Sequence, residues 1–170
     1  FNLLRRPALP SQIPYLTGDD DNSYAVFDGV DDHINYGSNI IYNFDSSRDY
    51  SFSVWVNYAG KGVDGTGGTI LGRYSASSGY IVYNYDDSRG LLFQSNGVVF
   101  ISNYHLNNNQ WYHVVYSKNS SGQFFFVNGI KVANKSIDTL SVASSSFYIG
   151  RYSSSDTQYF NGSLDNVLVL

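Results

Sequence analysis

The chain has 170 residues, of which 42% are hydrophobic and 14% are charged, so it is long enough and apolar enough to form one domain with a sizeable core. Its formal net charge of -4, and basic residues that form no run beyond Arg5-Arg6, argue against nucleic-acid binding. It contains no cysteine, which excludes disulfide bonds and thiol nucleophiles, and no stretch is apolar enough for membrane insertion.

The acidic residues favour β-structure. All 14 are aspartate, whereas most helices depend on glutamate, and the chain is also rich in tyrosine, with 16 residues. The chain starts at Phe1 and contains no methionine, so we expect it to be part of a longer or processed protein.

Residues 1–22 differ from the rest of the chain. They contain all three prolines and end in the acidic run Asp19-Asp20-Asp21. Proline and consecutive charges disfavour a packed element, so we predict an extended N-terminal arm or interdomain linker, and we interpret the acidic run as solvated. Such an arm could contact other protein subunits.

From Tyr24 onward, short apolar stretches separated by turn residues recur about every ten residues. Asn128-Gly129, between two apolar runs, is the clearest hairpin turn, because both residues tolerate positive φ. No stretch shows a helical period. We therefore predict that residues 23–170 form an all-β, two-sheet antiparallel jelly-roll sandwich. The predicted strands lie near residues 24–28, 33–36, 49–58, 68–73, 79–85, 90–94, 97–102, 111–118, 123–128, 130–134, 146–151 and 158–169.

The strand at 50–58 alternates between two faces. One face is aromatic or apolar and should enter the core, and the other is polar except for Trp55. Trp55 could be a platform on which a sugar ring stacks, or it could simply cover the sheet under a loop.

The last predicted strand carries Asp165, a carboxylate that needs a partner if it is buried. If the first and last strands lie side by side, Asp28 and Asp165 would face the same region.

Six segments, in order, resemble the concanavalin A-like lectin/glucanase superfamily, and within it the laminin G-like jelly-roll domains. The resemblance covers roughly residues 24–170, and it implies one convex and one concave antiparallel sheet, extracellular or surface placement, and a binding or adhesion role without catalysis. The segments that carry it are Phe27-Asp28-Gly29-Val30-Asp31-Asp32-His33-Ile34, Tyr50-Ser51-Phe52-Ser53-Val54-Trp55-Val56, Trp111-Tyr112-His113-Val114-Val115, Phe126-Val127-Asn128-Gly129, Tyr148-Ile149-Gly150 and Phe160-Asn161-Gly162-Ser163-Leu164-Asp165-Asn166-Val167.

The resemblance also implies a structural calcium ion near the junction of the first and last strands, with Asp28 and Asp165 as its side-chain ligands. The alternative is that both aspartates cap turns and accept hydrogen bonds from backbone amides. The glucanases of this superfamily use two glutamates on one strand, and this chain has no glutamate, so we expect no enzymatic activity.

A repeated Gly-Arg-Tyr tripeptide supplies the ligand candidates. Arg73-Tyr74 and Arg151-Tyr152 each follow an apolar strand end and precede a serine-rich loop. A guanidinium that forks onto oxygens beside a stacking ring can hold a sugar or a carboxylate. The alternative is that each arginine only covers apolar surface with its stem.

These observations predict an extracellular, cell-surface or virion-surface module that binds a glycan or glycoprotein. The alternative is a structural domain of a larger surface assembly, such as a phage or virus decoration or fibre protein that uses residues 1–22 for protein contacts. A polysaccharide-active enzyme is a distant third.

Overall fold

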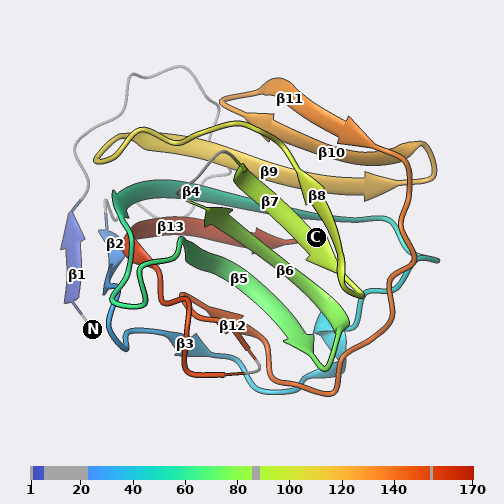
Figure 1. Ribbon diagram of the computed structural model, residues 1–170, viewed down its shortest axis with the longest axis horizontal. Helices are drawn as coiled ribbons and strands as arrows, with labels where there is room; N and C mark the ends of the chain where they lie inside the picture. The colour runs from blue at the N-terminus through green and yellow to red at the C-terminus, as the bar shows by residue number, and fades with distance from the viewer. Residues whose placement is uncertain (1, 6–22, 86–88, 154) are drawn as a thin grey trace.

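The computed structural model describes residues 2–5, 23–85, 89–153 and 155–170, which form two antiparallel sheets packed face to face (Figure 1). The jelly-roll sandwich predicted from the sequence is thereby confirmed. The seven-stranded sheet A contains, in spatial order, β1 (Asn2–Arg5), β2 (Ser23–Asp28), β13 (Asn161–Val169), β4 (Tyr50–Gly60), β9 (Trp111–Asn119), β10 (Gly122–Val127) and β11 (Ile130–Lys135). The six-stranded sheet B contains β3 (Ile34–Asn35), β12 (Tyr148–Ile149), β5 (Gly68–Ser75), β6 (Ser78–Tyr85), β7 (Gly90–Ser95) and β8 (Val98–Ile101).

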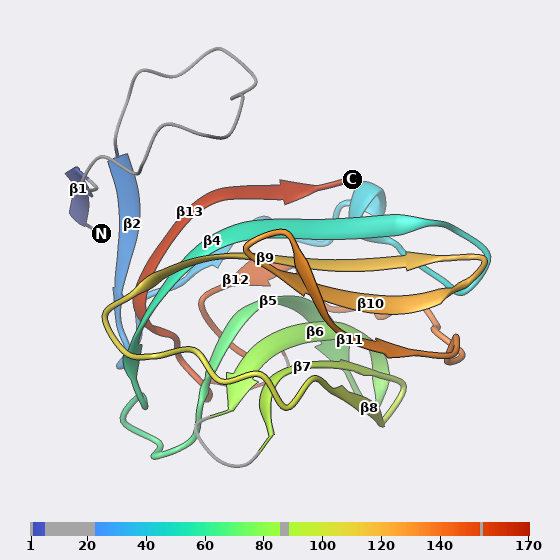
Figure 2. The same cartoon turned by 90° about the horizontal axis from the view of Figure 1, so that it is seen from above.

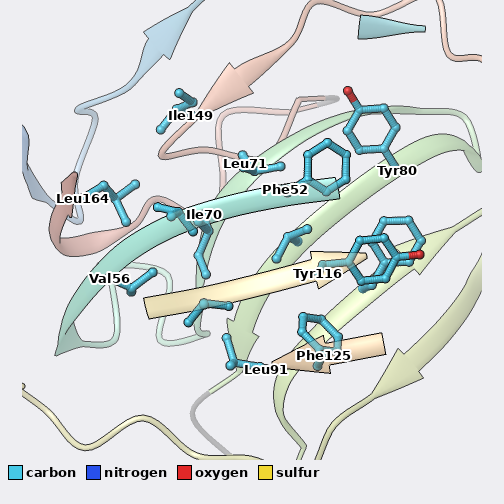
Figure 3. Packing of buried hydrophobic residues seen from close by; sticks show 14 of the residues in the cluster. Phe52, Val56, Ile70, Leu71, Tyr80, Leu91, Tyr116, Phe125, Ile149 and Leu164 are labelled. Atoms are coloured by element: carbon cyan, nitrogen blue, oxygen red, sulfur yellow. The ribbon is translucent and has the colours of Figure 1, made fainter. Parts of the chain in front are cut away.

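Alternation along the strands builds the core. The five apolar or aromatic side chains of β4 from Tyr50 to Tyr58 are at most 4% exposed, as predicted, and those between them are only partly buried. Phe52 stacks on Tyr80 of sheet B with ring centroids 5.0 Å apart, and on Tyr116 at 5.9 Å (Figure 3). Large rings therefore fill the space between the sheets.

Curvature distinguishes the two sheets. Figure 2 shows β5 and β6 bowing toward sheet A, so the outer face of sheet B lies on the hollow side of the curve. This is the face on which most of the candidate site described below is built.

Every strand predicted from the sequence is present, and β2 and β13, the first and last predicted strands, pair with each other. Two elements were not predicted: strand β1, which pairs with β2, and the short 3₁₀ helix η1 (Ile40–Tyr42). Residues 6–22 lie outside the described part of the chain, so the predicted arm and the role of Asp19–Asp21 stay predictions. Within the described ranges, no helix has the length and apolar character needed to cross a bilayer.

Candidate functional site

A second apolar cluster lies on the outer face of sheet B, separate from the main core. On β6, Tyr80 and Val82 belong to the main core, whereas Ile81 and Tyr83 point to the outside of the sandwich. Tyr74, Ile81, Tyr83 and Leu92 form this outer cluster, and Tyr85, Val99 and Tyr152 pack against it. We call its four tyrosines, Tyr74, Tyr83, Tyr85 and Tyr152, together with Gln94, which is hydrogen-bonded to two of them, the tyrosine face.

Hydrogen bonds fix the floor of the tyrosine face. The Tyr83 hydroxyl donates to Gln94 Oε1 (3.3 Å), and Gln94 Nε2 donates to the Tyr74 hydroxyl oxygen (3.0 Å). The Gly97 N–H donates to the same oxygen (3.1 Å). Burial raises the pKa of Tyr83 to about 12, so this hydroxyl keeps its proton at neutral pH.

The upper part of the face is accessible. Tyr74 and Tyr83 are 3% and 6% exposed, whereas Tyr85, Tyr152 and Gln94 are only partly buried. The Tyr74 and Tyr152 rings lie 5.8 Å apart, and those of Tyr83 and Tyr85 lie 5.3 Å apart. Two partly exposed rings, Tyr85 and Tyr152, thus lie beside a floor that is already packed, and the partly buried Gln94 is hydrogen-bonded into that floor.

A cation extends the face. The Arg89 guanidinium carbon lies 3.6 Å from the centroid of the Tyr85 ring. This stacking presents a planar group with several N–H donors next to an aromatic ring.

Arg73 does not belong to the ligand set, so the structure corrects the prediction at this position. Its side chain is 4% exposed, and its guanidinium donates hydrogen bonds within the protein. Its Nε donates to Ala143 O (3.1 Å), its Nη1 to Asn39 O (2.7 Å) and its Nη2 to Ser38 O (3.4 Å). Arg73 therefore ties two loops to β5 and is not accessible to a ligand.

The other three ligand candidates from the repeated tripeptides are Tyr74, Arg151 and Tyr152, and unlike Arg73 each of them lies at the surface or close beneath it. The rings of Tyr74 and Tyr152 lie close together, although Tyr74 is part of the floor and not an accessible platform. Arg151 stacks on the ring of Tyr148 at 4.4 Å and forms an ion pair with Asp156. The tyrosine face thus holds two of the four predicted residues, and the two arginines have separate partners.

Trp55 lies on the opposite side of the sandwich, on the outer face of sheet A. Its ring is 5.2 Å from that of His113 on β9, and Trp111 on the same strand lies 5.4 Å from Tyr24. Ser53 Oγ is hydrogen-bonded to His113 Nε2 (2.8 Å), and partial burial lowers the pKa of this histidine below its usual value of 6.5. Trp55 and the tyrosine face therefore cannot contact the same sugar ring.

The pairing of β2 with β13 also corrects the predicted calcium site. Asp28 is opposite Asn161, and Asp165 lies four residues further along β13, which is about 13 Å at the rise of a β-strand. Calcium–oxygen distances are about 2.3–2.6 Å, so the two carboxylates do not bind one ion. Asp165 is only partly buried, and its Oδ1 accepts a hydrogen bond from the Asn166 N–H (2.7 Å).

Asp28 instead belongs to an acidic turn with Asp31 and Asp32, whose ligand oxygens lie within 4.8 Å of one another. Asp28 Oδ1 accepts the Val30 N–H (2.8 Å), and Asp32 Oδ2 accepts the Asp28 N–H (3.2 Å). The three carboxylates could supply oxygens at a spacing that calcium accepts, yet backbone hydrogen bonds already explain the positions of two of them. Calcium binding stays a prediction.

Sequence reasoning missed Tyr83, Tyr85, Arg89 and Gln94. A signal was present, because Tyr83 and Tyr85 are two residues apart and must share one face of a strand. Which face that is depends on the packing of the two sheets, which local sequence does not reveal.

Comparisons with solved structures agree with this architecture. Domain 4 of AbnA, a GH43 extracellular arabinanase from Geobacillus stearothermophilus solved in complex with arabinotriose, has a TM-score of 0.61 and 18% identity, with 94% of this chain and 75% of that chain covered. The binding domain of Paraclostridial Mosquitocidal Protein 1 has a TM-score of 0.66 and 16% identity, covering 99% of this chain but 43% of the other. The SAP-like pentraxin of Limulus polyphemus has a TM-score of 0.53 and 15% identity, covering 85% and 77%. At such identities, the likeness shows the fold alone.

No curated protein matches the chain. Residues 28–170, most of its length, match the family described as the Concanavalin A-like lectin/glucanases superfamily. The chain belongs to this superfamily.

Proposed function

We propose that the protein is a non-catalytic carbohydrate-binding module whose ligand lies on the tyrosine face of sheet B. The observation that carries the proposal is the pair of partly exposed rings, Tyr85 and Tyr152, which pack against one cluster on the outer face of sheet B. Their floor is held by hydrogen bonds between Gln94, Tyr74 and Tyr83, so the site needs little ordering when a ligand binds.

The chemistry of this face suits a sugar. Tyrosine rings offer flat apolar area against the C–H groups of a sugar ring, and they lose little conformational entropy on binding. Gln94 can both donate and accept hydrogen bonds, which matches hydroxyl groups that do the same. The Arg89 guanidinium on Tyr85 adds donors for ring or hydroxyl oxygens.

The arabinotriose complex of the GH43 arabinanase domain supports a glycan as the ligand class. A neutral glycan agrees best with the face, because its five members carry no charge and the chain as a whole has a net charge of -4. Extracellular, cell-surface or virion-surface placement belongs to the same proposal, since such glycans are found there.

Absence of catalysis is also part of the proposal. Glycoside hydrolysis usually requires a pair of carboxylates at a fixed separation, and the tyrosine face contains no carboxylate. Binding without turnover of the bound glycan is the expected behaviour.

The test is a glycan array that includes arabino-oligosaccharides, followed by calorimetric titration of the glycan that binds best. We expect Tyr152→Ala and Gln94→Ala to weaken binding about tenfold or more each, as for residues at the centre of an interface. Trp55→Ala is the matched control, because it removes a partly buried aromatic residue from the opposite sheet and should leave affinity unchanged.

Two results would contradict the proposal. No binding to any glycan would contradict the proposed function, and loss of binding in Trp55→Ala with retention in Tyr152→Ala would place the site on sheet A.

The outer face of sheet A also favours a second candidate function, a structural role in a larger assembly. Both tryptophans of the chain lie there, and tryptophan is enriched in protein interfaces.

A further inference from the structure

A second group of aromatic side chains lies at the margin of sheet B, outside the tyrosine face. On β12, Ile149 is 4% exposed and belongs to the main core, so its neighbour Tyr148 points to the outside of the sandwich. The His33 ring lies 5.8 Å from the Tyr148 ring and 6.3 Å from the Tyr159 ring. All three side chains are only partly buried. We call His33, Tyr148 and Tyr159 the margin group.

Arg151 joins the margin group to the tyrosine face. Its guanidinium carbon lies 4.4 Å from the centroid of the Tyr148 ring, and its Nε donates a hydrogen bond to Tyr152 O (3.3 Å). The Tyr152 ring in turn lies 5.8 Å from that of Tyr74. An unbroken series of contacts therefore leads from the margin group to the floor of the tyrosine face.

The register of the strands gives the length of this series. Tyr148 is opposite Gly72 on β5. Gly72 is opposite Ile81 on β6, and Ile81 is opposite Gln94 on β7. Figure 1 shows β12, β5, β6 and β7 side by side. Neighbouring strands lie about 4.8 Å apart, so the backbone positions of Tyr148 and Gln94 are separated by about 14 Å. A single sugar ring cannot contact both residues, whereas a chain of several sugars can.

The margin group has the chemistry to hold a sugar. His33 Nδ1 lies 2.8 Å from Asp31 O, and a carbonyl oxygen only accepts hydrogen bonds, so Nδ1 donates. In the neutral ring, Nε2 is then an acceptor for a hydroxyl group. The Tyr148 ring offers flat apolar area against C–H groups. Arg151 forms an ion pair with Asp156, so its charge is balanced within the protein and the junction favours a neutral ligand.

We propose that the margin group is a second sugar subsite, which continues the tyrosine face, and that the ligand is a linear, neutral oligosaccharide lying across the strands of sheet B. This subsite, which rests on the proposed function, sets a minimum length for the ligand. The sugar unit on Tyr148 and His33 is a different unit from the one on Gln94, and the two are joined through the chain that passes Tyr152.

The test is calorimetric titration of the protein with three series of linear probes, the xylo-, cello- and arabino-oligosaccharides, from the disaccharide to the hexasaccharide. In the series that binds, we expect the affinity to rise about tenfold or more from the shortest to the longest probe. Tyr148→Ala should lower the hexasaccharide affinity to about that of the disaccharide. Tyr148→Phe keeps the ring and should retain most of the gain, whereas Tyr152→Ala should weaken the binding of both probes.

His33 supplies a second variant and a second readout. It precedes β3, so His33→Ala tests the margin group without a change in β12. In NMR spectra, the imidazole signals of His33 should shift when the hexasaccharide binds, whereas those of His113, on the outer face of sheet A, should not. Phe124→Ala is the matched control, because it removes a partly buried ring from the outer face of sheet A and should leave both affinities unchanged.

Circular dichroism shows whether each variant keeps its strands. Equal affinities for the disaccharide and the hexasaccharide overturn the second subsite, and so does a gain with length that survives in both folded variants, Tyr148→Ala and His33→Ala. If the glycan array shows binding but no linear probe binds, the extended ligand is overturned while the proposed function stands. A blank array overturns both.

Discussion

Arg73 and Arg151 have the same neighbours in sequence, Gly before and Tyr after, but different surroundings in space. The Arg73 guanidinium is enclosed and donates to three backbone carbonyls from two loops. The Arg151 guanidinium lies beside Tyr148 and pairs with Asp156, whose side chain is 76% exposed. Hydrogen bonds from an enclosed cation contribute far more stability than an ion pair in contact with water.

Replacing each arginine by methionine, which keeps an apolar stem, separates the two roles. We expect Arg73→Met to lower the free energy of unfolding by about 3 kcal/mol, because three carbonyls lose a charged donor. Arg151→Met should lower it by less than about 1 kcal/mol. Urea unfolding measures both, and equal losses would contradict the different roles assigned to the two side chains.

His113 should make stability depend on pH. Partial burial beside Trp55 favours the neutral imidazole, so the pKa of His113 in the folded protein lies below the usual 6.5. The unfolded chain then takes up a proton at a higher pH than the folded protein does, and stability falls as the pH falls through the window just below 6.5. The stability that this histidine contributes at neutral pH is absent once the pH is below its folded pKa.

Calorimetric melting from about pH 7.5 to about pH 5.5 tests this window. The melting temperature of the unaltered protein should fall more than that of His113→Gln. His33 and His105 are present in both proteins, so the difference isolates His113. An identical fall in the two proteins would show that another group is responsible.

At the scale of elements, two tight hairpins share one backbone conformation but differ in residue type. Asn128 and Gly129 join β10 to β11 with φ of 51° and 79°, and Ala76 and Ser77 join β5 to β6 with φ of 49° and 64°. Such turns require positive φ at both central residues, which asparagine and glycine accept and alanine and serine resist. Asn128 also accepts a hydrogen bond from the His113 N–H (2.9 Å) through its Oδ1.

Exchanging the two turn sequences should move stability in opposite directions. We expect Ala76→Asn with Ser77→Gly to raise the free energy of unfolding by about 1–2 kcal/mol, since it relieves left-handed strain at two residues. Asn128→Ala with Gly129→Ser should lower it by at least as much. A Cβ at Gly129 meets no atom within 4 Å, so strain and the lost Asn128 hydrogen bond, not a steric clash, cause the loss. Denaturant midpoints that move in the same direction for both pairs would contradict this reading.

At the scale of the whole molecule, the sandwich separates two surfaces. The tyrosine face lies outside sheet B, and the tryptophans lie outside sheet A. A glycan and an assembly partner would therefore not compete for the same residues. The acidic turn of Asp28, Asp31 and Asp32 follows β2 and belongs to neither surface.

The predicted calcium ion can be tested on that turn by melting the protein in chelator and in about 1 mM calcium. An ion that binds only the folded protein stabilises it by about 2.7 kcal/mol at one hundred times its dissociation constant, so the melting temperature should rise in calcium. Asp31→Asn should abolish the rise, and Asp49→Asn, an exposed aspartate before β4, should keep it. Equal melting temperatures in the two buffers would contradict the prediction that the folded protein binds calcium.

The sequence by itself determined the strands and the sandwich. Residues 50–58 illustrate why: side chains of a strand alternate between its two faces, so an alternating pattern locates both the strand and the face that enters the core. Turn residues such as Asn128-Gly129 mark where strands end, and this information is local. The pairing of the first and last strands entered only as a condition, which the structure meets in β2 and β13.

Only the tertiary structure decided the candidate site. The register of β2 against β13 separates Asp28 from Asp165, and the packing of loops onto β5 encloses Arg73 while leaving Arg151 beside Tyr148. The sequence named both Trp55 and Tyr152 as candidates for stacking on a sugar, yet these two residues lie on opposite sides of the molecule. Register, and the choice of which face another sheet covers, depend on contacts between residues far apart in the chain, and no local pattern contains them.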